Sequence, residues 1–181
     1  MNFSPYKWEI WTVRKLVNKG DSPFLDKIMT TLSNPYQWIA PMIILVIYLL
    51  LIDVRGAITA LILGGISAGL ADSINFYVLK KRIIRIRPQY FLDDIKGIGA
   101  MNSGKRSFPS NHASNTIAIT LMLFFFFPHV LIPGAIAVFL VGYSRIYCGA
   151  HYPLDVLFGW LHGVFWAGNI YMFYRIIIEL I

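Results

Sequence analysis

Five long apolar runs constrain this chain more than any other feature of its sequence. They extend over Trp38 to Ile52, Gly56 to Leu79, Ile117 to Phe127, Val130 to Val141 and Val156 to Ile178. A helix needs about 20 predominantly apolar residues to cross the hydrocarbon core of a bilayer. The runs therefore predict an all-α integral membrane bundle of about five transmembrane helices, some of them short and ending among the lipid headgroups.

The composition agrees with a single membrane domain. The 181 residues are 57% hydrophobic and only 14% charged, whereas an ordinary soluble domain is about 25% charged. This balance excludes a disordered chain, and the length favours one domain over residues 1–181. We expect residues 1–35 to precede the transmembrane bundle and residues 36–181 to form it.

The first 35 residues have an amphipathic pattern. The opening "MNFSPYKWEIWTVRKLVNKG" has no continuous apolar stretch, so we expect no cleavable signal peptide. Apolar residues recur at helical spacing at Phe3, Tyr6, Ile10, Val13 and Val17. This pattern, and a similar one over Ser22 to Pro35, predicts helices that lie in the membrane interface. A short soluble helical cap is the alternative.

Basic residues are concentrated at one end of the predicted bundle. Threading five spans leaves Arg55 and Arg175 at one end and the other 14 of the 16 Lys and Arg residues at the opposite end. The positive-inside rule would place the basic end in the cytoplasm, but a site for an anionic substrate also collects cations, so sidedness stays open. Because the basic residues adjoin spans, we expect a lipid phosphate rather than a nucleic acid as the anionic partner.

Other single residues narrow the possibilities. The one cysteine, Cys148, excludes an intramolecular disulfide and a cysteine-based zinc cluster. Asp72 lies deep in the second run and must be paired or hydrated. It is either a functional residue or part of a structural polar cluster with Ser73 and Asn75. Gly65-x3-Gly69 predicts close helix packing.

The first polar motif is "KKRIIRIRP", Lys80 to Pro88, at the exit of the second run. Lys80 and Arg87 are about two helical turns apart, so we expect both on one side of a helix that Pro88 ends. Anchoring of a span end by snorkelling cations is the alternative for these two residues. That role is the one we expect for Lys81, Arg82 and Arg85.

The second motif is "RSFPSNHASN", Arg106 to Asn115. Ser110, Asn111 and His112 precede the third apolar run, so backbone N–H groups and the serine hydroxyl face the same end of the bundle. A helix start of this kind is a ready anion site, and His112 is placed to donate a proton to a leaving oxygen. A simple helix cap with an interfacial histidine is the alternative.

The third motif is "SRIYCGAHYPLD", Ser144 to Asp155. His151 and Asp155 are four residues apart, so the carboxylate can hold the imidazole in one tautomer and leave the other nitrogen free as a nucleophile. Pro153 is suited to begin the last helix, and Arg145 ends the fourth run.

Taken together, the three motifs resemble the type 2 phosphatidic acid phosphatase (PAP2) family, within the acid phosphatase and vanadium haloperoxidase superfamily. The family pattern is Lys-x6-Arg-Pro, then Pro-Ser-Gly-His, then Ser-Arg-x5-His-x3-Asp. The resemblance covers roughly Ile58 to Gly163, with one departure from the pattern: Asn111 stands where glycine is usual. Asparagine tolerates left-handed backbone better than most residues.

The resemblance implies the same roles as the residues themselves suggest. Lys80, Arg87 and Arg145 would neutralise phosphate oxygens, with Ser110 and the peptide near Asn111 completing the cradle. His151 would attack phosphorus, Asp155 would orient it, and His112 would protonate the leaving group and then activate water. The family implies no cofactor and no metal.

Three alternatives remain beside this reading. A metal site would use His112, His151 and one of Asp93 or Asp94, although the nearby cations would repel a divalent ion. A non-catalytic lipid-phosphate binding or transport protein would reuse the same pocket. A haloperoxidase would bind vanadate there, but its natural setting is soluble.

The resemblance implies a bacterial inner-membrane lipid phosphatase with its site facing the periplasm, against the charge count. Family members act on lipid A 1-phosphate, undecaprenyl diphosphate, phosphatidylglycerol phosphate or phosphatidic acid, and the motifs do not choose between them. The extra cations Lys96, Lys105 and Arg106 favour a headgroup with several phosphates. The sequence does not predict an oligomeric state.

Overall fold

The structure, a computed structural model, describes residues 2–17, 22–99 and 104–180 and is helical throughout its regular parts. Its longer helices are α1 (Lys7–Val17), α2 (Pro23–Ser33), α3 (Ile39–Ile52), α4 (Val54–Ile74), α7 (Asn111–Phe126), α8 (Leu131–Tyr147) and α9 (Pro153–Leu180). Shorter elements are η1 (Pro35–Trp38), η2 (Asn75–Leu79), α5 (Lys80–Arg82), α6 (Pro88–Phe91) and η3 (Pro128–Val130). The predicted all-α class is confirmed.

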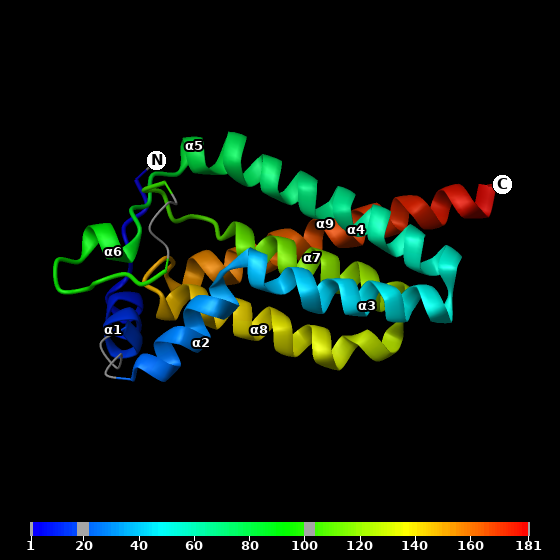
Figure 1. Ribbon diagram of the computed structural model, residues 1–181. Coiled ribbons are helices and arrows are strands. Elements are labelled where there is room, and N and C mark those ends of the chain that lie inside the picture. The colour runs from blue at the N-terminus through cyan, green and yellow to red at the C-terminus, as the bar shows by residue number, and fades with distance from the viewer. Residues whose placement is uncertain (1, 18–21, 100–103, 181) are drawn as a thin grey trace.

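Helices α3, α4, α7, α8 and α9 run along one bundle, with the two ends of the chain at opposite ends of it (Figure 1). Among the described residues, four helical segments are long and apolar enough to cross a membrane: Pro35–Ile52, Val54–Arg82, Pro128–Tyr147 and Pro153–Leu180. The expected third span, α7, has 16 residues and extends about 24 Å at 1.5 Å per residue. It is therefore shorter than a full crossing.

Short as it is, α7 lies at the centre and packs against α4, α8 and α9. Glycines of its neighbours allow this approach: a Cβ added at Gly159 or Gly163 of α9 would collide with the backbone carbonyl of Ser110 or Ser114. The predicted contact at Gly65 and Gly69 is wrong, because an added Cβ there would meet no atom within 4 Å. Gly159 and Gly163 of α9 are instead the glycines that allow close contact between helices.

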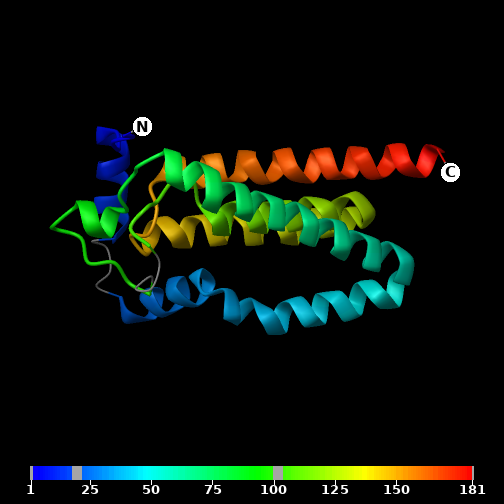
Figure 2. The ribbon, with the colours of Figure 1, turned by 90° about the horizontal axis from the view of Figure 1, so that it is seen from above.

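The outside of the bundle is apolar. Large side chains stand exposed along several helices: Ile44, Leu51, Ile62, Ile132, Phe139, Leu161 and Phe173. A water-soluble protein rarely exposes so continuous an apolar surface, whereas lipid tails solvate it. α3 is set apart from α8 and α9 in Figure 2 and packs on α4 near their shared turn, where Leu49 is buried with Ala57 and Ala60.

Helix α1 lies across the end of the bundle (Figures 1 and 2). Part of its apolar stripe faces the protein, because Val13 is buried with Leu92, Ile95 and Tyr152. Its tryptophans, Trp8 and Trp11, are exposed instead. α1 thus covers the basic end as a cap. Residues 1 and 18–21 of the expected interfacial segment lie outside the described residues.

The packing of α9 on α7 yields a stability prediction. Gly163→Ala places a methyl group against the Ser114 carbonyl, whereas Gly168→Ala in the same helix meets no atom within 4 Å. Overpacking costs about 1–3 kcal/mol, and an unhindered Gly→Ala change in a helix stabilises by about 0.5–1 kcal/mol. Thermal unfolding in detergent micelles should show a lower midpoint for Gly163→Ala and an equal or higher one for Gly168→Ala. Equal midpoints for the two variants would contradict the packing.

Candidate active site at the basic end of the bundle

The first motif does not form the predicted helix up to Pro88. α5 ends at Arg82, and Ile83 and Arg87 have extended backbone. In an extended segment, alternate side chains point to the same side, so Arg85 and Arg87 face inward while Ile84 stays exposed. The alternation of isoleucine and arginine in "IIRIR" is the signal that could have predicted this. Lys80 and Arg87 still meet, but across a bend in the chain.

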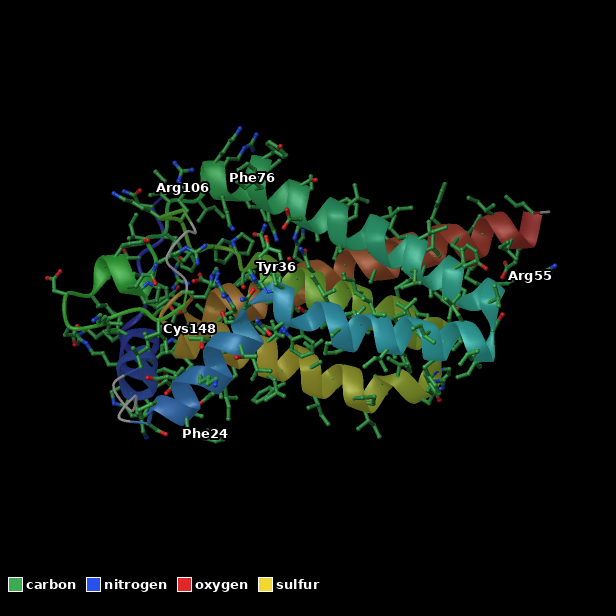
Figure 3. All side chains as sticks on the ribbon, viewed as in Figure 1. Phe24, Tyr36, Arg55, Phe76, Arg106 and Cys148 are labelled. Carbon is green, nitrogen blue, oxygen red and sulfur yellow. The ribbon has the colours of Figure 1, made fainter. Side chains whose placement is uncertain are left out.

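Backbone hydrogen bonds tie the three motifs together. The first and second motifs pair through Ser107 N–H to Arg85 C=O at 2.7 Å, and through Arg87 N–H to Lys105 C=O at 3.0 Å. The second and third are joined by Ser110 N–H to Asp155 C=O at 2.9 Å. The convergence that the sequence predicted is therefore built from main-chain contacts, and Figure 3 shows Arg106 and Cys148 at this end and Arg55 at the other.

The imidazole of His151 lies in the loop between α8 and α9, two residues before Pro153. It is buried, and its Nε2 is 3.3 Å from Nη1 of Arg87. Because a guanidinium only donates hydrogen bonds, this contact requires a lone pair on Nε2 and places the ring hydrogen on Nδ1. The structure thus favours the tautomer in which Nε2 is a nucleophile.

Asp155 lies on the Nδ1 side of that ring, at 3.7 Å from Oδ2 to Nδ1. This separation is too long for a hydrogen bond. The carboxylate is held mainly by other groups: Oδ2 accepts from Tyr152 N–H at 2.8 Å, and Oδ1 accepts from Arg85. Asp155 therefore faces His151, and its orientation is set by Arg85 and by the N–H of Tyr152, the residue before α9.

The site carries more positive than negative charge. Burial lowers the pKa of His151 well below its ordinary 6.5, and the charges of Arg87, Arg145, Lys80 and His112 lower it further. Burial also lowers the pKa of Arg87, opposed by the carboxylate of Asp155. These interactions show that the predicted residues of all three motifs share one electrostatic environment, and they keep the His151 ring neutral.

Arg145 projects from the last turn of α8 and is buried. Its Nη1 donates to the carbonyl oxygen of Ser33 at 3.1 Å and to the hydroxyl of the same serine. Ser33, at the end of α2, was not predicted as a site residue. It fixes the guanidinium in the free protein and would have to share it with a bound anion.

The start of α7 forms as predicted. Ser110 caps the helix, with its Oγ accepting from Ala113 N–H at 3.5 Å. Asn111, the residue in place of glycine, does not adopt left-handed backbone, because positive φ occurs among the described residues only at glycines. Its side chain donates to Asp72 of α4. The side-chain amide of Asn111 is therefore directed toward α4.

This contact also shows which groups pair with Asp72. Its Oδ1 accepts from Asn111 and, at 3.3 Å, from Asn115. Ser73 is exposed and Asn75 bonds to Ser114 instead. Asp72 is therefore paired with α7, the helix that carries His112, and the expected cluster with Ser73 and Asn75 is wrong.

The most important residues that sequence reasoning missed are Arg85 and Glu9. Arg85, expected as a snorkelling cation, is 1% exposed and forms ion pairs with both Asp155 and Glu9. Glu9, in α1, is fully buried. The signal in the sequence was a glutamate between apolar positions of an amphipathic helix. The signal did not identify the partner, because Arg85 lies 76 residues further along the chain.

The alternative metal site does not assemble in the described part of the chain. Asp94 pairs with Arg14 at the surface, 2.7 Å from Nε to Oδ2, and no group of three His, Cys, Asp or Glu side chains is arranged to hold a metal ion. His112 and His151 lie among cations instead.

The lowered pKa of His151 is directly measurable. At about pH 5.5 an ordinary histidine is roughly 90% protonated, whereas we expect His151 to stay neutral because burial and the surrounding cations disfavour a further positive charge. Nitrogen NMR spectra of ¹⁵N-histidine-labelled protein in micelles test this, with His151→Gln assigning the signal. A titration midpoint at or above 6.5 would show that burial and the neighbouring cations do not lower the pKa of His151.

Comparisons with known proteins identify the family of this chain. The PAP2 superfamily matches residues 42–178 of the chain. An undecaprenyl-diphosphatase of Sulfolobus acidocaldarius is 33% identical over 82% of this chain and 70% of its own length. A lipid A 4'-phosphatase of Bacteroides thetaiotaomicron is 28% identical over 80% and 67%, respectively.

Solved structures share the fold. The crystal structure of Aquifex aeolicus LpxE matches with a TM-score of 0.71 and 24% identity, over 95% of this chain and 99% of the other. A transmembrane PAP2-type phosphatidylglycerolphosphate phosphatase from Bacillus subtilis matches with a TM-score of 0.65 and 22% identity, over 93% and 85%. Because the family match covers most of the chain, including all three motifs, this protein is a multi-pass membrane member of the PAP2 superfamily.

Proposed function

We propose that this protein is a lipid phosphatase that hydrolyses a headgroup phosphate through a phosphohistidine intermediate on His151. The observation that carries the proposal is the buried His151 ring with its Nε2 3.3 Å from Nη1 of Arg87, among the charges of Arg145 and Lys80. A buried nucleophile surrounded by cations suits an anionic phosphoryl group. The phosphatases among the relatives support the same reaction class.

In the first step, Nε2 of His151 attacks phosphorus and the bond from phosphorus to the leaving oxygen breaks. His112 takes up a proton when the anionic phosphate binds and gives it to that oxygen, so the lipid leaves as an alcohol or as a lipid monophosphate. The imidazole becomes a phosphorylated cation, and Asp155 stabilises it from the Nδ1 side.

In the second step, His112 removes a proton from water while the water oxygen bonds to phosphorus. The bond from phosphorus to nitrogen breaks, which releases inorganic phosphate and restores the neutral ring. Lys80, Arg87 and Arg145 bind the non-bridging oxygens throughout, with Ser110 and the first N–H groups of α7. In the free protein, Arg87 contacts Nε2 of His151. When substrate is bound, Arg87 donates this hydrogen bond to the phosphate instead.

We also propose that the reaction needs no metal ion. The cations around His151 supply the charge stabilisation that a divalent ion would otherwise give, and they repel such an ion.

The substrate we favour carries a second phosphate beside the scissile one. A cavity of about 380 Å³ adjoins Lys80 and Arg87, and its other lining residues are Phe76, Lys81, Gly104, Lys105 and Arg106. A lipid diphosphate, or a lipid with two phosphorylated sugars, would place its second anion against these cations. Lys96, expected in this group from the sequence, is exposed and does not line the cavity.

The proposed activity predicts phosphate release from at least one lipid in a panel of undecaprenyl diphosphate, lipid A, phosphatidylglycerol phosphate and phosphatidic acid. The rate should be unchanged by EDTA. His151→Ala should lower kcat by about 10⁴-fold or more, since the nucleophile is lost, while lipid binding survives.

Rapid acid-free quenching with ³²P-labelled lipid should trap an alkali-stable, acid-labile phosphoprotein in the wild type and none in His151→Ala. Absence of release from every lipid, with binding intact, would instead support the non-catalytic lipid-phosphate binder. Loss of release in EDTA, restored by a divalent ion, would overturn metal independence.

The cations that line the cavity predict that their removal affects a lipid diphosphate more than a lipid monophosphate. Lys81→Ala and Lys105→Ala should each raise KM for a lipid diphosphate by about tenfold, because one charge-assisted hydrogen bond contributes about 1.5 kcal/mol or more. KM for a lipid monophosphate should stay nearly constant. Lys96→Ala is the matched control, since it removes the same charge outside the cavity. Equal changes for both kinds of lipid would count against a second phosphate site.

A further inference from the structure

We propose that Glu9 of α1 is a positioning residue for the proposed reaction, acting through Arg85 on Asp155 and thereby on His151. The proposal rests on the proposed function and extends the site to a helix outside the three motifs. It assigns α1 a role in the reaction, in addition to its packing across the basic end of the bundle.

Three buried charged side chains form the contact. Nη2 of Arg85 pairs with Oε2 of Glu9, and Nη1 pairs with Oδ1 of Asp155. All three side chains are fully inaccessible to solvent in these pairs. Removing one partner from a buried pair leaves an uncompensated charge. The position of the Arg85 guanidinium therefore depends on both carboxylates.

Glu9 also binds the turn that carries Asp155. Its Oε1 accepts from Leu154 N–H at 3.1 Å, in the first turn of α9, and its Oε2 accepts from Tyr6 N–H at 3.0 Å. The contacts close a ring from Glu9 to Arg85, to Asp155, along α9 to Leu154 and back to Glu9. A closed ring restrains the rotation of the Asp155 carboxylate more strongly than Arg85 alone would.

Two aromatic rings lie against the guanidinium. The Cζ atom of Arg85 lies 4.3 Å from the ring centre of Phe3 and 4.6 Å from that of Tyr152. The carbonyl oxygen of Arg85 accepts from Ser107 N–H and its hydroxyl. Arg85 therefore has a fixed side chain and a fixed backbone, as a group that orients another residue requires.

The charge balance explains why a second carboxylate is needed. Arg85 with Asp155 alone would be neutral, and Asp155 would then offer little stabilisation to the cation that forms at His151. With Glu9 the group carries two negative charges and one positive charge. The resulting net negative charge lies behind a ring that otherwise faces Arg87, Arg145, Lys80 and His112.

Glu9→Gln removes this charge with little change in shape. We expect kcat to fall about tenfold or more, within the range found when a partner that orients a metal-binding histidine is lost, with KM little changed. Arg14→Gln is the matched control: it lies on α1 and breaks the exposed pair with Asp94 without touching the buried group. It should keep wild-type kcat and KM.

The pH profile separates positioning from a loss of folded protein. Removing a negative charge lowers the pKa of His151, so the acid limb of kcat/KM should move to lower pH in Glu9→Gln. The substrate and the cations facing the ring are the same in both proteins. A merely structural defect would scale the profile down without moving it.

If Glu9→Gln does not yield folded protein, Arg85→Lys tests the same inference. It keeps the positive charge, but one ammonium cannot span both carboxylates with a planar fork, so a tenfold or larger loss of kcat is expected. Kinetics of either folded variant indistinguishable from those of Arg14→Gln would overturn the inference while leaving the proposed function intact. A wild-type protein that releases no phosphate from any lipid would instead reject the proposed function.

Discussion

The contact between the start of α7 and the first turns of α9 is the constraint on which the rest of the structure depends. The hydrogen bond from Ser110 N–H to Asp155 C=O joins the second motif to the third. It forms because Gly159 and Gly163 let the backbones of the two helices approach. Small residues are the usual means of close packing between helices in lipid, where no hydrophobic force drives association.

The convergence of the three motifs also gives the site an excess of positive charge. Lys80, Arg87 and Arg145 come from different elements and converge near His151. In water such cations would repel one another weakly, but in a protein interior the repulsion is stronger. The pocket is therefore suited to an anion, and Glu9 and Asp155 supply part of the compensating charge through Arg85.

Particular residues show why prediction from the sequence succeeded and failed. The start of α9 at Pro153 and the cap of α7 at Ser110 were predictable, because helix starts depend on neighbouring residues. The path of Lys80 to Arg87 was predicted wrongly, because the segment pairs with residues 105–107 of a distant loop rather than continuing its helix. Arg85 was misjudged because its partners are separated from it by about 70 residues or more along the chain.

The sequence by itself determined the membrane bundle, its basic end and the residue types of the three motifs, because apolar length and local spacing act within single helices. Only the tertiary structure decided that α1 covers the site, that Asn111 turns to Asp72, and that Arg85 links Glu9 to Asp155. These choices depend on which distant groups share a low-dielectric interior. A buried charge requires a partner there, and the chain order does not specify which residue provides it.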